Sequence, residues 1–100
     1  MLVVAGVVRL NPEKREEAMV AAREMMTATR AEAGCISYTF SADLDDPGAF
    51  RIFEEWKDQA ALDAHFEAPH MATFAAKVGG FGVEEMTVQK YEVASVGPVR

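Results

Sequence analysis

The sequence predicts an α+β domain built on a four-stranded antiparallel sheet. Four apolar or alternating runs indicate strands, and turn residues separate the second run from the third. Helical patterns lie between the first and second runs and between the third and fourth. The resulting order is β-α-β-β-α-β. Right-handed crossovers convert this order into a ferredoxin-like arrangement, with the helices on one face of the sheet.

The first strand and helix are indicated by residues 2–34. Residues 2–10 are a continuous apolar, β-branched run, typical of a strand buried on both faces. Asn11 can cap a helix and Pro12 suits its first position, so a helix is predicted over about 12–32. Gly34 is predicted to stop it in the left-handed conformation. Apolar and small residues recur at helical spacing at Ala18, Ala22, Met25, Met26 and Thr29.

The middle of the chain is predicted to form a hairpin. Residues 35–42 alternate as a strand does, residues 43–48 contain the Asp, Pro and Gly of a turn, and residues 49–57 form the third strand. Alternation places three side chains of the third strand on one face: Ile52, Glu54 and Trp56.

The second helical region is predicted to be interrupted. Asp58 can cap a helix, Pro69 restarts a second one, and Gly79-Gly80 ends it. Residues 82–93 are predicted to be the last strand, and 94–100 a loose tail. The chain is therefore predicted to be one domain over 1–100, with its core over about 2–93.

Composition narrows the classes of function. The formal net charge is -6, which argues against binding to nucleic acid or to an anionic membrane surface. The single cysteine, Cys35, allows no intrachain disulfide and no thiolate zinc cluster. It is expected to be buried and inert. We expect a cytoplasmic protein, because the first residues also lack the layout of a signal peptide.

One face of the predicted sheet lacks a cover. The first, second and fourth strands carry apolar residues on both faces, more than one helical layer can bury. Exposed apolar surface of this kind usually marks an association site. We therefore expect a homodimer packed sheet to sheet with twofold symmetry.

The residues most capable of chemistry concentrate in one strand–helix unit. Glu54 and Trp56 lie near the end of the third strand, and His65 and His70 follow in the helical region that returns toward it. A carboxylate, an indole and two imidazoles are thus predicted to lie near one another. The acidic run at 43–46 lacks the ligand spacing of a calcium loop, and no metal site is expected.

Several motifs together resemble the antibiotic biosynthesis monooxygenase (ABM) family, over about residues 2–93. The resemblance implies a dimeric α+β barrel. Activities in the family include cofactor-independent oxygenation of quinols and polyketide aromatics, oxygenation of haem, and isomerisation of a small phosphorylated sugar-like signal. The motifs are Gly34-Cys35-Ile-Ser-Tyr38, Asp46-Pro47, Phe53-Glu54-Glu55-Trp56, Ala60-Ala61-Leu62-Asp63-Ala64-His65 and Pro69-His70.

The resemblance implies a monooxygenase that oxidises a small quinol or polyphenolic aromatic with dioxygen. No cofactor is expected, because the substrate is itself the reductant. His65 is the candidate general base, since imidazole titrates in the useful range. Glu54 would orient an imidazole or hold a substrate hydroxyl, and His70 would be a second polar anchor. Ordinary structural roles for these three residues remain open.

The resemblance also implies an apolar pocket that accepts aromatic rings. Each candidate for its walls is equally a candidate for the core. These substrate-binding candidates are Trp56, Tyr38, Phe66, Phe74, Met25 and Met26.

Three other functions stay open. Haem degradation matches poorly, because the first strand has no asparagine and the second helical region no tryptophan. An isomerase would need a phosphate anchor, for which the sequence offers arginines but no glycine-rich loop. The last is a non-catalytic, dimeric module that binds small molecules. The arginines are Arg9, Arg23, Arg30 and Arg51.

Overall fold

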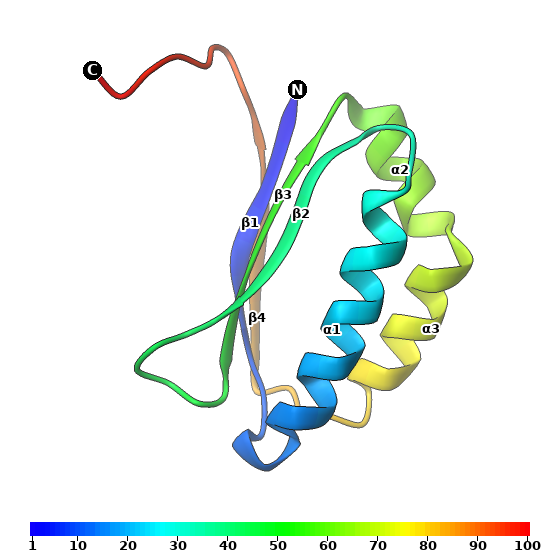
Figure 1. Ribbon diagram of the computed structural model, residues 1–100, viewed down its shortest axis with the longest axis vertical. Helices are drawn as coiled ribbons and strands as arrows, with labels where there is room; N and C mark the ends of the chain where they lie inside the picture. The colour runs from blue at the N-terminus through cyan, green and yellow to red at the C-terminus, as the bar shows by residue number, and fades with distance from the viewer.

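A four-stranded antiparallel sheet forms one layer of the protein, and three α-helices cover one of its faces (Figure 1). The computed structural model describes all residues, 1–100. It confirms the predicted ferredoxin-like α+β fold. The elements are β1 (Leu2–Arg9), the 3-10 turn η1 (Pro12–Lys14), α1 (Arg15–Arg30), β2 (Cys35–Ala42), β3 (Ala49–Trp56), α2 (Gln59–Glu67), α3 (Pro69–Val78) and β4 (Glu85–Glu92).

The first strand lies inside the sheet, whose order is β2-β3-β1-β4. Strand β1 pairs antiparallel with both neighbours, so that Val4 lies opposite Glu54 on one side and Lys90 on the other. Because side chains alternate along a strand, this register sends the even-numbered side chains of β1 and β3 to one face. Val4, Ile52 and Trp56 on that face are buried, which identifies it as the face that the helices cover.

Several element ends differ from the prediction by one residue or more. The first turn of the helix predicted at 12 is a 3-10 turn, and α1 ends at Arg30. The last strand begins at Glu85 instead of residue 82. The prediction that Gly34 adopts the left-handed conformation was wrong. The glycine with a positive φ is Gly82, at 64°. Gly34 is needed for a different reason: a Cβ there would lie 2.1 Å from the Cβ of Ala61.

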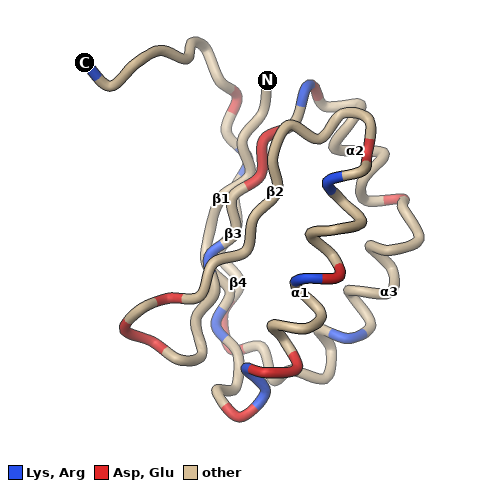
Figure 2. The backbone as a smooth tube through the Cα atoms, viewed as in Figure 1, with Lys and Arg blue, Asp and Glu red and all other residues tan.

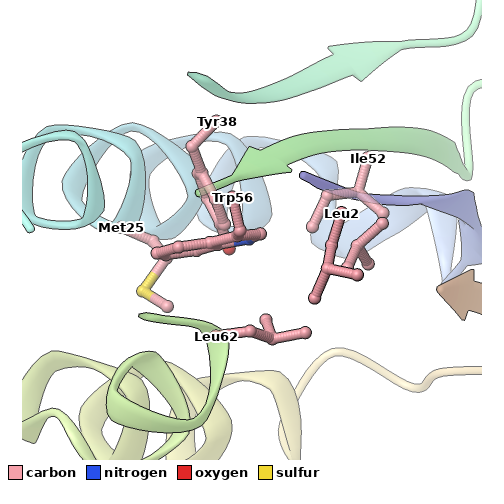
Figure 3. Packing of buried hydrophobic residues seen from close by; sticks show 7 residues of the cluster. Leu2, Met25, Tyr38, Ile52, Trp56 and Leu62 are labelled. Carbon is pink, nitrogen blue, oxygen red and sulfur yellow. The ribbon is translucent and has the colours of Figure 1, made fainter. Parts of the chain in front are cut away.

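The core divides into two clusters along the interface between helices and sheet. The first, called the Trp56 cluster here, has the indole among aliphatic and aromatic neighbours, with Leu62 reaching it from α2 (Figure 3). It consists of Leu2, Val4, Met25, Tyr38, Ile52, Trp56 and Leu62. The second, called the Phe50 cluster, consists of Leu10, Ala18, Ala21, Phe50 and Phe81.

The other face of the sheet has no helical cover (Figure 1). Phe53 of β3 and Tyr91 of β4 keep about half of their surface exposed there. Arg9 also lies on this face and pairs with Asp46 and Glu85. The sheet-to-sheet homodimer stays a prediction.

Charged residues are distributed along most of the chain, and several acidic ones occupy the turn between β2 and β3 (Figure 2). In this turn the Asp43 carboxylate accepts hydrogen bonds from the backbone N–H groups of Asp45 and Asp46. These bonds lower the pKa of Asp43. None of the helices combines the length and the apolar composition that crossing a bilayer requires.

Candidate functional site

Two imidazoles share one carboxylate oxygen at the end of the helical layer. His65 Nδ1 and His70 Nε2 each lie 2.7 Å from Oε2 of Glu32. With Glu32 ionised, each nitrogen carries a proton and donates it to the oxygen. This network joins the end of α1 to both α2 and α3.

A break in the helical layer brings the two histidines together. Asp58 caps α2 by accepting a hydrogen bond from the backbone N–H of Ala61 at 2.9 Å, which fixes where α2 begins. Ala68 is extended, with φ −68° and ψ 143°, and Pro69 then starts α3. In one continuous helix, residues five apart would face directions about 140° apart. With the break, the rings of His65 and His70 lie 6.1 Å apart, centroid to centroid.

Glu32 reaches the histidines because the turn after α1 packs closely on α2. The backbone N–H of Lys57 donates to the carbonyl oxygen of Gly34 at 2.9 Å, which ties this turn to the end of β3. The missing side chain of Gly34 leaves room for Ala61. The turn therefore places the Glu32 carboxylate beside His65 and His70, at the junction of α2 and α3.

Aromatic rings surround His65. Its ring centroid lies 4.8 Å from that of Trp56, 5.5 Å from that of Tyr38 and 5.7 Å from that of Phe66. His65 is 2% exposed. The His70 side chain is 26% exposed, so the network has a buried end and an end that meets solvent.

Glu54 and Trp56 form a second polar contact within the core. Trp56 Nε1 donates to Oε1 of Glu54 at 2.8 Å, and both side chains are buried. Burial raises the pKa of Glu54, while the hydrogen bond from Trp56 and the charge of His65 oppose that rise. Burial also raises the pKa of Tyr38. Cys35 is partly exposed, so the expectation that it is buried was wrong. Partial burial and then the Glu32 charge still raise the pKa of its thiol and favour the inert, protonated form.

A small apolar cavity lies at the other end of the helix–sheet interface. Its volume is about 50 Å³, and it opens to solvent. All of its lining side chains are hydrophobic. They are Val8, Leu10, Ala18, Ala22, Phe40, Phe50, Phe74, Val78, Phe81 and Met86.

The structure brings some of the predicted wall residues together and separates others. Phe74 lines the apolar cavity and also borders, with Met25 and His70, a hollow between α1 and α3. Met26 borders a different hollow beside β2 and β3. Phe66 is 59% exposed. Trp56 and Tyr38 are buried within the Trp56 cluster.

His65, the predicted base, and Glu54, the carboxylate predicted to orient it, also lie away from the cavity. Neither His65 nor Glu54 is among the cavity-lining residues. A row of neighbouring rings joins the cavity to His65. The ring centroids lie 5.6 Å apart for Phe74 and Phe40, 5.5 Å apart for Phe40 and Tyr38, and 5.5 Å apart for Tyr38 and His65. The substrate-binding and catalytic roles of these residues stay predictions.

Three of the four arginines considered as phosphate anchors are engaged within the protein. Arg9 pairs with Asp46 and Glu85, Arg30 Nε donates to the carbonyl oxygen of Tyr38, and Arg51 pairs with Asp43. Arg23 borders the hollow that also contains Met26.

Glu32 is the site residue that the sequence analysis missed. It lies just beyond the end of α1, where the helix dipole disfavours an acid, and this position was the one available signal. Its partners are 33 and 38 residues away in sequence, so no local pattern links them. The donor atoms of Glu32, His65 and His70 all lie within 4.8 Å of one another, which makes them the set that could hold a metal ion.

Comparison with known proteins relates the chain to a family of oxygenases. The family model described as antibiotic biosynthesis monooxygenase matches residues 1–77. An uncharacterized protein of Synechocystis sp. is 34% identical over 93 residues, which are 93% of this chain and 63% of that relative. YcnE of Bacillus subtilis, named as a putative monooxygenase, is 35% identical over 77% of this chain and 81% of its own length.

Comparison with a solved structure leads to the same family. The crystal structure of an antibiotic biosynthesis monooxygenase superposes with a TM-score of 0.86 at 30% identity. The match covers 95% of this chain and 100% of the other. The correspondence therefore extends over nearly the whole chain.

Proposed function

We propose a function from the fact that this chain belongs to the antibiotic biosynthesis monooxygenase family. Its relatives support a monooxygenase-like or small-molecule-binding role. Within that role, we propose a cofactor-independent monooxygenase that oxidises a small quinol or polyphenolic aromatic with dioxygen. One oxygen atom enters the product and the other leaves as water. The quinol supplies all four electrons, so hydroquinone and dioxygen give hydroxyquinone and water.

The observation that carries this proposal is the hydrogen bond between His65 and Glu32. The Nδ1–H of His65 donates to the carboxylate, which leaves the lone pair of Nε2 free to accept a proton. The carboxylate also stabilises the imidazolium formed when that proton is taken. A deprotonated quinol is a stronger reductant and passes an electron to dioxygen; the two radicals then combine and eliminate water.

The apolar cavity supports an aromatic substrate. Its lining has no polar side chain, so a ring with few polar groups fits it better than a sugar or a phosphate. Phe40 lines the cavity and contacts Tyr38, which contacts His65. For His65 to act as the base, the reacting hydroxyl must reach past these two rings. This is the most demanding requirement of the proposal.

The same cavity favours a second candidate function. None of its lining residues can titrate, and the Glu32–His65–His70 network lies outside it. A cavity of this kind can hold an apolar ligand without transforming it. The second candidate is therefore a non-catalytic module that binds small apolar molecules.

Oxygen uptake with a panel of hydroquinones and naphthols tests the two candidates. His65→Ala removes the base, and Met86→Trp closes the cavity mouth at a position that is 60% exposed. Met86→Leu is the control for the second change. The oxygenase proposal expects both His65→Ala and Met86→Trp to abolish uptake while folded, as judged by circular dichroism.

Three results separate the alternatives. Equal uptake by the wild type and His65→Ala would reject His65 as the base. Loss in His65→Ala with full activity in Met86→Trp would remove the cavity from the pathway. Saturable binding of the aromatics that Met86→Trp abolishes, with no uptake by any variant, would establish the binding module.

A further inference from the structure

The Glu32–His65–His70 network has the composition of a transition-metal site. Two imidazole nitrogens and one carboxylate oxygen form a donor set that Zn²⁺ and its neighbours in the first transition row prefer. Both nitrogens already point at one oxygen, each 2.7 Å from it. A single ion placed among the three atoms would take the place of both shared protons.

We propose that Glu32, His65 and His70 bind one divalent transition-metal ion, with Zn²⁺ as the ion that fits best. Metal–ligand bonds of about 2.0–2.2 Å in tetrahedral geometry place donor atoms roughly 3.4 Å apart. The two nitrogen–oxygen distances of 2.7 Å must therefore lengthen. The movement falls on the side chains of Glu32 and His70, which are partly exposed.

The site combines one fixed ligand with two adjustable ones. His65 is held among the rings of Trp56 and Tyr38 and is buried. The side chains of Glu32 and His70 are 15% and 26% exposed, and they lie at a turn and at the first turn of α3. The ion can thus enter from the solvent side, where water would complete its coordination.

The buried carboxylate of Glu54 lies near His65, the fixed ligand. Trp56, whose ring lies 4.8 Å from that of His65, donates its indole N–H to Glu54. Once an ion occupies Nδ1 of His65, the ring proton must sit on Nε2, which is then a donor. Metal-bound histidines usually give this proton to a carboxylate or carbonyl, and Glu54 is the buried carboxylate nearby.

The proposal goes beyond the oxygenase function and opposes it in one respect. A proton on Nε2 prevents His65 from acting as a base through that nitrogen. Bound Zn²⁺ would then inhibit the proposed oxygenation. Metal binding itself is independent of any substrate, so the two proposals can fail separately.

Titration of the tag-free protein with Zn²⁺ by calorimetry tests the site. The sequence contains two histidines and both belong to the site, so an affinity tag would supply the only competing imidazoles. We expect one Zn²⁺ per chain, and a rise in melting temperature on binding. Co²⁺ in place of Zn²⁺ should show the intense visible bands of tetrahedral coordination.

Two variants probe the adjustable ligands, whose removal leaves the buried core intact. His70→Ala and Glu32→Gln should each weaken Zn²⁺ binding by at least about tenfold to a hundredfold and remove the Co²⁺ bands. Glu17→Gln is the matched control, because Glu17 is an exposed acid that pairs with Lys14 at the opposite end of α1. It should bind as the wild type does.

The contrary outcomes are equally definite. Zn²⁺ binding that survives both His70→Ala and Glu32→Gln unchanged would place the ion elsewhere and overturn the proposal. The absence of saturable binding to the wild type would overturn it as well. Circular dichroism of each variant shows that a lost signal comes from a folded protein.

Discussion

The two ends of the helix–sheet interface bury different kinds of groups. At the Trp56 end the core contains Glu54 and His65 beside the indole, and polar contacts join them to their neighbours. At the Phe50 end the buried side chains are all apolar, and they leave a cavity between helices and sheet. At the Trp56 end the buried polar groups are packed closely, and the hollows beside His70 and Glu32 are open to solvent. At the Phe50 end the cavity is lined by apolar side chains alone.

The difference follows from what each kind of group needs when it is buried. A polar group removed from water must find a partner, so its neighbours are fixed in position and close together. In this structure Thr29 Oγ1 is the single fully buried side-chain oxygen or nitrogen that lacks one. Apolar side chains impose no such demand and tolerate an opening among them.

The largest expected effect comes from removing the indole at the Trp56 end. Trp56→Ala removes a side chain with no exposed surface and should lower the free energy of unfolding by about 3–5 kcal/mol. Denaturant unfolding followed by circular dichroism measures this change. Phe66→Ala is the control, because Phe66 also contacts His65 but is 59% exposed, and it should cost far less. Equal losses in the two variants would contradict the rigid packing of the indole.

A single methyl group should disturb the approach of Glu32 to the histidines. Gly34→Ala places a Cβ 2.1 Å from that of Ala61, and overpacking of this kind costs about 1–3 kcal/mol. Thermal unfolding checks the loss. The double variant Gly34→Ala with Ala61→Gly should recover part of it, since the clash disappears. Gly97→Ala, which meets nothing within 4 Å, should leave the melting temperature unchanged.

A smaller effect concerns Glu54, whose buried carboxyl group should make the free energy of unfolding depend on pH. Because the pKa of Glu54 is raised on folding, the unfolded chain releases this proton at a lower pH than the folded one. The stability that Glu54 provides is full below the ordinary carboxyl pKa. It is lost as the pH rises through the raised value. Glu54→Gln cannot titrate, so the difference in unfolding free energy between wild type and variant should shrink as the pH rises. A constant difference from acid to neutral pH would contradict the raised pKa.

The smallest effect concerns an ion pair in solvent. Lys77 Nζ lies 2.7 Å from Oε2 of Glu24, and both side chains are substantially exposed. Lys77→Ala should cost only about 0.2–1 kcal/mol, since exposed pairs contribute little. High salt should reduce the cost further in denaturant unfolding. A loss comparable with that of Trp56→Ala would mean that this pair, next to the apolar end, is as important as the buried contacts.

Local patterns were sufficient to predict the fold. The apolar run of 2–10, the turn at 43–48 and the helix break at Pro69 each depend on residues close in sequence. The unit that contains Glu54, Trp56, His65 and His70 was predicted for the same reason. Element ends were less certain, since the 3-10 turn at 12–14 and the late start of β4 depend on tertiary contacts.

The rest of the site could not be predicted because it depends on contacts between distant segments. Glu32 belongs to the site through the close approach of Gly34 to Ala61, and Gly34 was assigned a different role from its position after a helix. The cavity arises from the shapes of side chains on several elements, and of the predicted walls Phe74 lines it. Roles for the remaining candidates stay predictions.

The extended residue Ala68 makes the protein unequally tolerant of changes in chain length. One residue inserted between α2 and α3 would turn α3 by about 100° and carry His70 away from Glu32. The segment that follows β4 has no such constraint, since a side chain added at Gly97 meets nothing within 4 Å. Peptide epitopes or fluorophores therefore belong in that segment, whereas the junction of the two short helices must keep its present length.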